Sequence, residues 1–373
     1  MSKTNSFVCT SCGKVYALET RDWRCDCGGF FDFESEPAFD PTLINGGENS
    51  LWRYRAFLPL DATWEPVTLG EGNTPLVRVD WRGRPLYFKV ESLAPTGSFK
   101  DRGSSVLVTA LRGLGIERVV EDSSGNAGAS LAAYAARAGI ACELCVPASA
   151  SGPKLAQMAA HGAEVIEIKG KREYAALAAW AAAAHGAYYA SHVYNPYFLT
   201  GTETFAFEVW EQLGQRAPAV LVIPVGNGSL LLGVYRGFRR LEQARLIQRM
   251  PRLYAVQAAA CAPIYQAFQS GATEVEPVIA AQTVASGIAI GHPPRSAQIL
   301  EAIRSTDGLV GCVTEEEIQQ ARKQLAHCGF YVEETSAVAL AALAQIDSAL
   351  PTSDSEVIVV PLTGHGLKTY SGQ

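Results

Sequence analysis

Short runs of apolar, largely β-branched residues alternate along the chain with longer segments in which alanine and leucine recur at helical spacing. The runs that predict strands are residues 85–91, 118–124, 141–148, 164–169, 219–225, 252–258 and 356–364. The segments that predict helices are residues 99–115, 128–139, 152–163 and 174–186, and a further helix after "GNGS" at 226–229. Apolar strands that alternate with helices are typical of parallel sheets covered on both faces, so the chain is predicted to be α/β with parallel sheets.

Composition restricts the classes of protein to which the chain can belong. Its 373 residues are 48 % apolar and 18 % charged, which is a globular profile with room for two or three domains. A formal net charge of −6 argues against a nucleic-acid partner, which would favour a basic face. The N-terminus lacks the apolar core of a signal peptide, and the alanine-rich run 175–190 is too short and interrupted to span a membrane. A cytoplasmic protein without a membrane partner is therefore expected.

Four of the nine cysteines gather near the N-terminus, where Cys9 and Cys12 form a C-x2-C pair and Cys25 and Cys27 a C-x-C pair. Two close pairs joined by a short hairpin can converge as four thiolates on one tetrahedral Zn²⁺. Four sulfur ligands leave no open position for a substrate, so the predicted role of this zinc ribbon is structural. The alternative is four unligated thiols in a flexible tail.

The remaining cysteines are predicted to be small residues of the core. Cys142 and Cys145 also form a C-x2-C pair, but they lie in a predicted strand, where positions three apart point to opposite faces. They are therefore not expected to share a metal ion. Cys261, Cys312 and Cys328 are predicted to be buried in the same way.

Glycine-rich and polar residues follow the predicted strands, at 122–130, 224–233 and 361–368. In parallel α/β folds, ligands bind at the loops that leave the carboxyl ends of the strands. One of these loops opens a helix, and its backbone N–H groups could bind an anion such as a phosphate. The alternative is that its glycines only allow the tight turn from strand to helix. Its residues are Gly226, Asn227, Gly228, Ser229 and Leu230.

Lys100 stands at the predicted start of a helix, where the helix dipole favours anions and not cations. Partial burial near a positive helix end would lower the pKa of the amine and make it reactive. A phosphate site together with such a lysine favours pyridoxal 5′-phosphate (PLP) held as a Schiff base. The alternative is an ordinary solvated lysine.

Several segments resemble the signatures of fold-type II PLP enzymes, and among these the threonine synthases most. The segments are "SLWRYRAFLP" (50–59), "LGEGNTPLVRV" (69–79), "PTGSFKDRG" (95–103), "SSGNAGAS" (123–130), "PVGNGSLLLG" (224–233), "SGIAIGHP" (286–293) and "PLTGHGLK" (361–368), with the N-terminal ribbon. The resemblance covers nearly the whole chain. It implies two parallel-sheet α/β domains of the fold-type II PLP enzyme kind with an N-terminal zinc ribbon. The implied bounds are 1–37 for the ribbon, 50–104 and 203–373 for a large PLP-binding domain, and 105–202 for a small domain. A homodimer is also expected.

The resemblance implies a role for each matching residue. Lys100 would form the Schiff base and shuttle protons, and Asn126 would hydrogen-bond the 3′ oxygen of PLP. Residues 226–230 would bind its phosphate, and the Thr363 hydroxyl would meet the pyridine nitrogen and leave it largely unprotonated. The implied reaction converts O-phosphohomoserine and water to threonine and phosphate, so the expected partner is a small amino-acid substrate.

The chain departs from the family pattern at three positions. Ala127 replaces a common threonine, Phe198 stands where an arginine that binds the substrate's phosphate is expected, and Glu203 stands where a lysine is frequent. An arginine fork suits a phosphate, whereas a glutamate opposes one. Donors that could contribute instead are His192, Asn195 and Tyr197, although His192 could equally be packed filler.

These departures leave the substrate open. The chain could catalyse β-replacement as cysteine or cysteate synthases do, or dehydrate a hydroxyamino acid as threonine dehydratase does. A non-catalytic, cofactor-binding scaffold is the alternative of another class, and the presence of Lys100 argues against it.

Overall fold

The computed structural model describes residues 6–81, 84–148, 150, 152–170, 172–346 and 356–369. The chain divides into two compact units, with residues 6–72 and 100–202 in unit 1 and residues 73–99 and 203–369 in unit 2. Residues 50–72 and 100–104 pack within unit 1, whereas the predicted large domain included them. Compactness alone does not define which domain binds the cofactor, so the domain assignment stays a prediction.

The N-terminal part of unit 1 is a small antiparallel sheet in the order β2-β1-β3, with β1 Ser6–Cys9, β2 Val15–Ala17 and β3 Phe31–Phe33. Aromatic side chains fill the space behind it. The Phe7 ring lies 5.7 Å from that of Phe31 and 5.2 Å from that of Phe33. The Tyr197 ring packs edge-on against the Phe7 ring, with ring centres 5.7 Å apart. Ring packing therefore joins the N-terminal sheet to the rest of unit 1.

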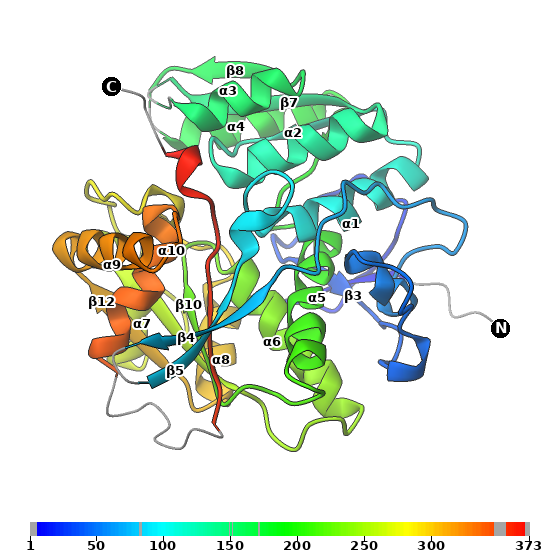
Figure 1. Ribbon diagram of the computed structural model, residues 1–373. Coiled ribbons are helices and arrows are strands. Elements are labelled where there is room, and N and C mark those ends of the chain that lie inside the picture. The colour runs from blue at the N-terminus through cyan, green and yellow to red at the C-terminus, as the bar shows by residue number, and fades with distance from the viewer. Residues whose placement is uncertain are drawn as a thin grey trace. The chain divides into compact units, whose positions relative to one another are not determined.

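The main sheet of unit 1 is parallel, in the order β8-β7-β6-β9. Strands β7 and β8 of this sheet are labelled in Figure 1. Its strands are β6 Arg118–Glu121, β7 Ala141–Pro147, β8 Glu164–Ile168 and β9 Tyr188–Tyr189. Its helices are α1 Lys100–Gly113, α2 Asn126–Ala138, α3 Pro153–Ala160 and α4 Arg172–Ala184. The predicted alternation of strand and helix is confirmed here, and only the short β9 was not predicted.

Of the five cysteines outside the ribbon, three are buried, one is half-buried and one is exposed, which corrects one prediction. Cys142 and Cys145 are buried in different hydrophobic clusters of unit 1, as expected for opposite faces of β7. Cys261 is also buried and Cys312 is half-buried, but Cys328 is exposed. Cys328 follows the last residue of a helix as its C-cap, a position that faces solvent, so its predicted burial is wrong.

The sheet of unit 2 has the order β12-β11-β10-β13-β5-β4. Its parallel strands are β5 Arg84–Lys89, β10 Val220–Pro224, β11 Arg252–Ala258, β12 Leu309–Val313 and β13 Ile358–Pro361. The edge strand β4, Leu76–Trp81, pairs antiparallel with β5. The α/β class with parallel sheets is confirmed, and the antiparallel edge is an addition to it.

Helices of unit 2 connect and cover these strands. They are α6 Ser229–Gln243, α7 Pro263–Ser270, α8 Ser296–Ser305, α9 Glu315–His327 and α10 Glu334–Ala341. Helix α5, Pro196–Gln212, contributes residues 196–202 to unit 1 and residues 203–212 to unit 2. Short 3-10 turns lie at Pro41–Leu43, Leu51–Phe57, Glu91–Leu93, Ser286–Ile288, Ala342–Ala344 and Gly366–Lys368.

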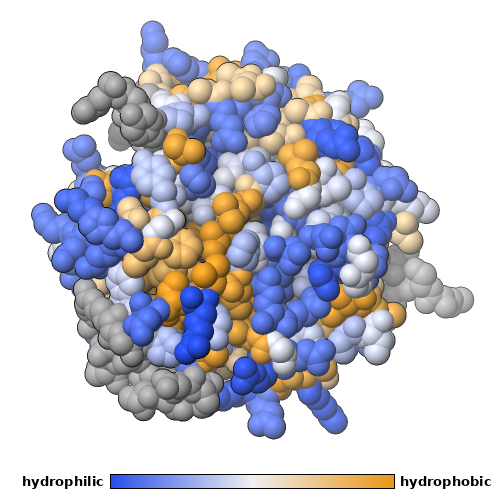
Figure 2. Space-filling view, viewed as in Figure 1, coloured by the Kyte–Doolittle hydropathy of each residue, from blue (hydrophilic) through white to orange (hydrophobic). Residues whose placement is uncertain are grey.

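Among the helices in the described ranges, none combines the length and apolarity needed to cross a lipid bilayer. Figure 2 shows hydrophilic residues over much of the viewed face, with hydrophobic residues in smaller patches among them.

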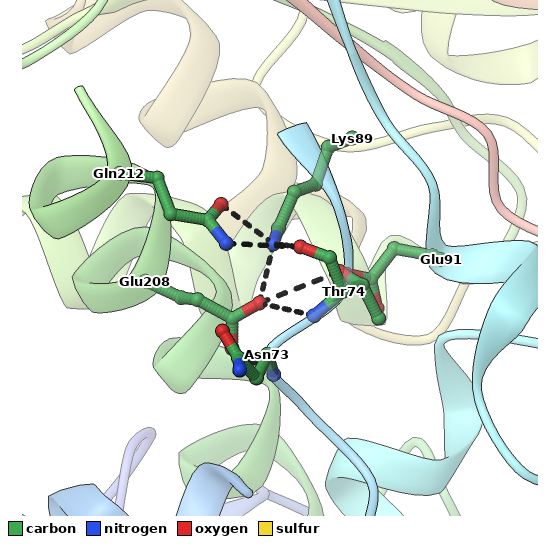
Figure 3. A network of polar contacts seen from close by, with 6 residues as sticks. All are labelled: Asn73, Thr74, Lys89, Glu91, Glu208 and Gln212. Carbon is green, nitrogen blue, oxygen red and sulfur yellow. Dashed lines mark hydrogen bonds and ion pairs between the residues drawn. The ribbon is translucent and has the colours of Figure 1, made fainter. Parts of the chain in front are cut away.

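A buried ion pair fixes a turn inside unit 2 (Figure 3). Lys89 at the end of β5 and Glu208 on α5 are almost completely excluded from solvent, and their charged groups are in direct contact. Glu208 also accepts the backbone N–H groups of Asn73 at 2.7 Å and Thr74 at 2.8 Å. Asn73 has a positive φ of 46°, which is rare for a residue other than glycine, so these bonds hold an unfavourable turn in place.

Candidate active site

Lys100 is the first residue of α1, and its amine lies in a partly enclosed environment. Burial lowers the pKa of Lys100 to about 8, although the nearby negative charge of Glu121 acts in the opposite direction. At pH 7 about a tenth of such amines are neutral, against far fewer at the ordinary lysine pKa. The amine is therefore suited to bond an aldehyde and to accept a proton.

The surroundings of Lys100 in unit 1 are formed by the first turn of α1 and the start of α5. The Phe198 ring is buried against Gly103, where an added Cβ would lie 2.5 Å from a ring carbon. The Lys100 Nζ lies 5.8 Å from the centre of the same ring, within cation–π range. Ser104, one helical turn after Lys100, has a buried hydroxyl without a hydrogen-bond partner among the described residues. A polar ligand beside Lys100 would fit such a hydroxyl.

Asn126 begins helix α2, which packs against α1 in unit 1. The residue before it, Gly125, is the N-cap and has no side chain that could satisfy the first N–H groups of the helix. Ala127, the departure from the family pattern, is buried. Lys100 and Asn126 thus begin two neighbouring helices of the same unit, as the sequence predicted for helix starts.

The glycine loop at 226–230 connects β10 to α6 in unit 2. Gly228 is the N-cap of α6 and has a φ of 77°, a conformation that favours glycine. A Cβ at Gly226 would lie 2.8 Å from the Ile288 Cα, and one at Gly228 would lie 2.3 Å from the Ile299 side chain. Gly228 has no side chain with which to cap α6, and backbone N–H groups at the positive end of a helix are the groups that an anion site uses.

Thr363 follows β13, which is the direct neighbour of β10 in the sheet of unit 2. The Thr363 hydroxyl lies 3.0 Å from that of Ser336, which in turn accepts the Gly364 N–H at 2.9 Å. The hydroxyl is thus buried and oriented by a second hydroxyl. Because β10 and β13 are parallel, the loop 226–230 and Thr363 leave the same edge of the sheet.

The chemistry of the residues in each unit, taken by itself, suits PLP. Unit 1 carries a lysine with a lowered pKa and an amide at a helix start, and unit 2 carries a glycine loop at a helix start and a hydroxyl at a strand end. The individual roles of Lys100, Asn126, Thr363 and residues 226–230 toward the cofactor stay predictions.

Glu203 has a partner that the sequence did not reveal. Its side chain is completely buried and forms an ion pair with Arg240 of α6 at 2.8 Å, within unit 2. The negative charge of Glu203 is therefore compensated there. The expectation that Glu203 would oppose a substrate phosphate is not supported by this geometry.

Two pairs of polar residues in unit 1 were not recognised from the sequence, and one of them includes Glu121, whose charge acts on Lys100. Glu121 ends β6, and its Oε1 lies 2.5 Å from the Nδ1 of His192. Next to it, Asp122 accepts the Tyr189 hydroxyl at 2.5 Å, and burial raises the pKa of the Asp122 carboxyl. The available signal was the pair of acids that ends an otherwise apolar strand directly before the "SSGN" segment.

The four ribbon cysteines converge as predicted. The Sγ atoms of Cys9, Cys12, Cys25 and Cys27 all lie within 4.8 Å of one another, with Cys9–Cys27 and Cys12–Cys25 separations of 3.5 Å. A tetrahedral site with Zn–S bonds of about 2.3 Å has S–S separations near 3.8 Å. The Tyr16 hydroxyl donates to Cys25 at 3.1 Å and lowers the pKa of that thiol to about 6. The cluster is compatible with a structural zinc ion.

Comparisons with known proteins agree with this geometry. The model of the family described as pyridoxal-phosphate dependent enzyme matches residues 67–364. The threonine synthase of Methanocaldococcus jannaschii is 37 % identical over 96 % of this chain and 92 % of its own length, and that of Methanosarcina acetivorans is 36 % identical over 96 % and 91 %. The crystal structure of a T.th. threonine deaminase superimposes with a TM-score of 0.68 at 25 % identity, over 80 % of this chain and 94 % of that one.

The family match and the extent of these similarities decide the class of the protein. The fold is that of fold-type II PLP enzymes, and the coarse activity is that of a PLP-dependent lyase. The predicted resemblance is thereby confirmed: the chain belongs to the pyridoxal-phosphate dependent enzyme family, as a relative of the threonine synthases.

Proposed function

We propose that the protein is a threonine synthase that converts O-phosphohomoserine and water to threonine and phosphate. The observation that carries the proposal is the similarity to threonine synthases along 96 % of the chain, which includes Lys100 and every segment around the proposed site. The lowered pKa of Lys100 and the glycine loop at 226–230 supply the chemistry that this reaction needs.

Lys100 is the proposed catalytic base and acid. When bound, PLP stabilises the negative charge that develops where a proton leaves the amino acid. The Lys100 Nζ removes the proton from the substrate Cα and returns a proton later in the reaction. An amine with a pKa of about 8 can do both near neutral pH, because neither form is rare.

The other proposed residues hold and orient the cofactor. The backbone N–H groups of residues 226–230 bind its phosphate, and Asn126 donates to its 3′ oxygen. Thr363, oriented by Ser336, contacts the ring nitrogen. A hydroxyl there leaves that nitrogen largely unprotonated, because it is a far weaker base than a carboxylate.

Substrate profiling tests this proposal. The purified, PLP-loaded protein is offered O-phosphohomoserine, O-phosphoserine, O-acetylserine and threonine separately, and the release of phosphate, acetate and keto acid is measured. Rapid phosphate release with threonine as the product supports the proposal. Turnover of only the other three compounds would refute it. Lys100→Ala should lose the visible absorbance of lysine-bound PLP and all turnover, which also excludes a scaffold without catalysis.

A second candidate is the dehydration of threonine. The observation that favours it is Phe198, which occupies the position expected for a phosphate-binding arginine and is fully packed against Gly103. The structural similarity to the T.th. threonine deaminase agrees with this alternative. Keto-acid release from threonine without phosphate release from O-phosphohomoserine would select it.

We also propose that the four ribbon cysteines bind one structural zinc ion. The convergence of all four Sγ atoms supports this, and metal analysis of the purified protein tests it. A homodimer remains a proposal that rests on the resemblance, and a cytoplasmic location remains one that rests on the composition of the chain. Sedimentation tests the first, and cell fractionation tests the second.

A further inference from the structure

Residues 188–198, which we call the tyrosine segment, contact both the N-terminal ribbon and the surroundings of Lys100. The segment runs from β9 to the start of α5, and β9 is a strand of only two residues that stands last in the order β8-β7-β6-β9. The ribbon here means residues 6–33, which carry the four converging cysteines. All of these residues belong to unit 1.

Aromatic residues that flank the C-x-C pair hold Tyr194 of the tyrosine segment. Trp23 stands two positions before Cys25, and its ring meets the Tyr194 ring edge-on, with ring centres 4.7 Å apart. Phe30 stands three positions after Cys27, and its ring stacks on the Tyr194 ring with centres 5.1 Å apart. Because both rings adjoin the same two cysteines, the conformation of this pair decides where Tyr194 can pack.

The C-x2-C pair has a corresponding contact with Tyr197. Cys9 ends β1, and Phe7 of the same strand packs edge-on against the Tyr197 ring with centres 5.7 Å apart. Phe33 of β3 packs against that ring with centres 5.0 Å apart. The Tyr197 side chain is fully buried, so the ribbon strands and the tyrosine segment share one aromatic core.

The end of the tyrosine segment lies against the proposed catalytic amine. Phe198 directly follows Tyr197 in the chain, and its buried ring contacts Gly103 in the first turn of α1. The centre of this ring lies 5.8 Å from the Lys100 Nζ. A shift of Tyr197 against the ribbon would therefore move a side chain that encloses Lys100.

A second connection passes through Tyr189. Its ring lies 5.1 Å from that of Trp23, and its hydroxyl donates to the Asp122 carboxylate at 2.5 Å. Asp122 directly follows Glu121, whose negative charge acts on Lys100. The ribbon thus contacts residues on both routes to the amine.

The ribbon has two states that a metal ion can select. Its strands have only three or four residues each. Folded units below about 40 residues usually need a metal ion or disulfides, and all described cysteines are free thiols. Metal binding and local folding are then one equilibrium. Without zinc, the turns that carry Trp23 and Phe30 lose the bonds that close them, and the tyrosine segment loses its aromatic support.

We propose that zinc binding at the ribbon and PLP binding beside Lys100 are thermodynamically coupled through the tyrosine segment. The inference goes beyond the proposed function, and it rests on the proposed zinc site and the proposed role of Lys100. Such coupling is reciprocal, so PLP raises the affinity for zinc, and zinc raises the affinity for PLP by the same factor. Coupled sites typically change each other's affinity by about five- to 150-fold.

Equilibrium titrations of the full-length protein test the coupling. The zinc affinity is measured against a competing chelator, for PLP-free protein and for PLP-loaded protein from which excess PLP has been removed. The PLP affinity is measured by visible absorbance, for zinc-loaded and zinc-free protein. Both affinities should change by the same factor, at least about fivefold, while the absorbance at saturating PLP stays the same. A zinc affinity that is independent of PLP overturns the proposal.

Trp23→Ala tests the route, because it removes a ring that contacts the tyrosine segment without removing a zinc ligand. The coupling factor should fall toward one, and Trp23→Phe, which keeps a ring, should restore most of it. Trp64→Ala is the matched control, since Trp64 is a half-buried tryptophan of unit 1 that packs on Gly113 at the far end of α1. Tyr194→Leu removes the contact from the other side and serves if Trp23→Ala does not hold zinc. Full coupling in the tested Trp23 or Tyr194 variant overturns the proposal.

Hydrogen exchange followed by mass spectrometry tests the role of the tyrosine segment directly. Removing zinc from the PLP-free protein should speed amide exchange in residues 188–198 and leave it unchanged in β7, which pairs with strands on both sides. Unchanged exchange in the tyrosine segment overturns the proposal. Faster exchange in both regions shows general unfolding and also overturns it.

These outcomes are separate from those that test the proposed function. If metal analysis finds no zinc, the zinc site and this inference fail together, whatever substrate the protein converts. If zinc is bound but O-phosphohomoserine is not converted, the proposed function fails, and the titrations still decide whether the two sites are coupled.

Discussion

Replacing Lys89 by methionine should reveal how much the buried ion pair of unit 2 contributes to stability. The Lys89 Nζ contacts Glu208 and also donates to the Thr74 carbonyl at 2.5 Å and the Gln212 side chain at 2.9 Å. Both charged groups are buried, with side-chain exposures of 0 % and 2 %. Methionine keeps the unbranched apolar stem but removes the ammonium group with its charge and its hydrogen bonds, so Glu208 is left as an uncompensated buried carboxylate.

The size of the effect follows from this geometry. Removing one partner of a buried ion pair costs about 3–5 kcal/mol. Glu208 keeps the backbone N–H groups of Asn73 and Thr74 at 2.7 and 2.8 Å, and such bonds to a charged acceptor stabilise it. We therefore expect Lys89→Met to lower the free energy of unfolding by about 3 kcal/mol, the lower end of the range. Adding Glu208→Gln should recover part of this loss, because a neutral acceptor no longer needs a cation.

The assay is urea unfolding of the PLP-loaded protein, followed by tryptophan fluorescence and circular dichroism, with the midpoint and slope fitted for each variant. Arg249→Met is the matched control, since Arg249 pairs with Glu356 at 3.0 Å in unit 2 but is 76 % exposed. An exposed pair contributes about 0–1 kcal/mol, so this control should change little. If Lys89→Met lowers the free energy of unfolding by less than about 1 kcal/mol at an unchanged urea slope, the buried pair contributes no more than an exposed pair. That result would refute the expected stabilisation by burial.

Three other features of the molecule give further predictions. The pKa of Lys100 is about 8 in the folded chain, against 10.5 ordinarily, so the unfolded chain binds more protons between these two pH values. The free energy of unfolding of the PLP-free protein should therefore rise as the pH rises from about 8 to 10.5. Urea unfolding at several pH values should show this rise in the wild-type protein and not in Lys100→Met. Replacing Cys9 and Cys12 by serine should abolish zinc binding measured by metal analysis and lower the melting temperature, while the visible PLP absorbance stays; an unchanged metal content would exclude the zinc site. Glu203→Lys, which installs the residue frequent in the family, should destabilise the protein by at least about 3 kcal/mol, because it sets a buried cation against Arg240; thermal unfolding at wild-type temperature would contradict this.

The sequence predicted seven of the described strands (β5, β6, β7, β8, β10, β11 and β13) and the helices α1–α4 and α6. Strands such as β10 and β11 are continuous apolar runs, and in parallel α/β folds ligands bind at the loops that follow such strands. Strand β12 and helices α7–α10 were not predicted. Three further elements that were missed have weak patterns. Strand β4 is half-exposed along its length, β9 has only two residues, and α5 begins in a stretch of mixed polarity.

Pairing between distant side chains could not be predicted, for a physical reason. Glu121 and His192 are 71 positions apart, and Lys89 and Glu208 are 119 apart. Each pair depends on which strands and helices are neighbours, and a periodic pattern determines the face of an element but not its neighbours. The sequence could therefore place His192 in a loop near the reaction but could not distinguish a positioned imidazole from packed filler.

The two departures in α5 are better understood as one rearrangement than as two losses. Phe198 occupies the space beside Gly103 that the first turn of α1 leaves open, and Glu203 is bonded to Arg240 inside unit 2. An arginine at 198 would have to bury its charge at a glycine contact with no room for it, and a lysine at 203 would face another cation. A single substitution can therefore restore neither the arginine expected at position 198 nor the lysine frequent at position 203. If the substrate carries a phosphate, the charge that recognises it must come from another part of the chain.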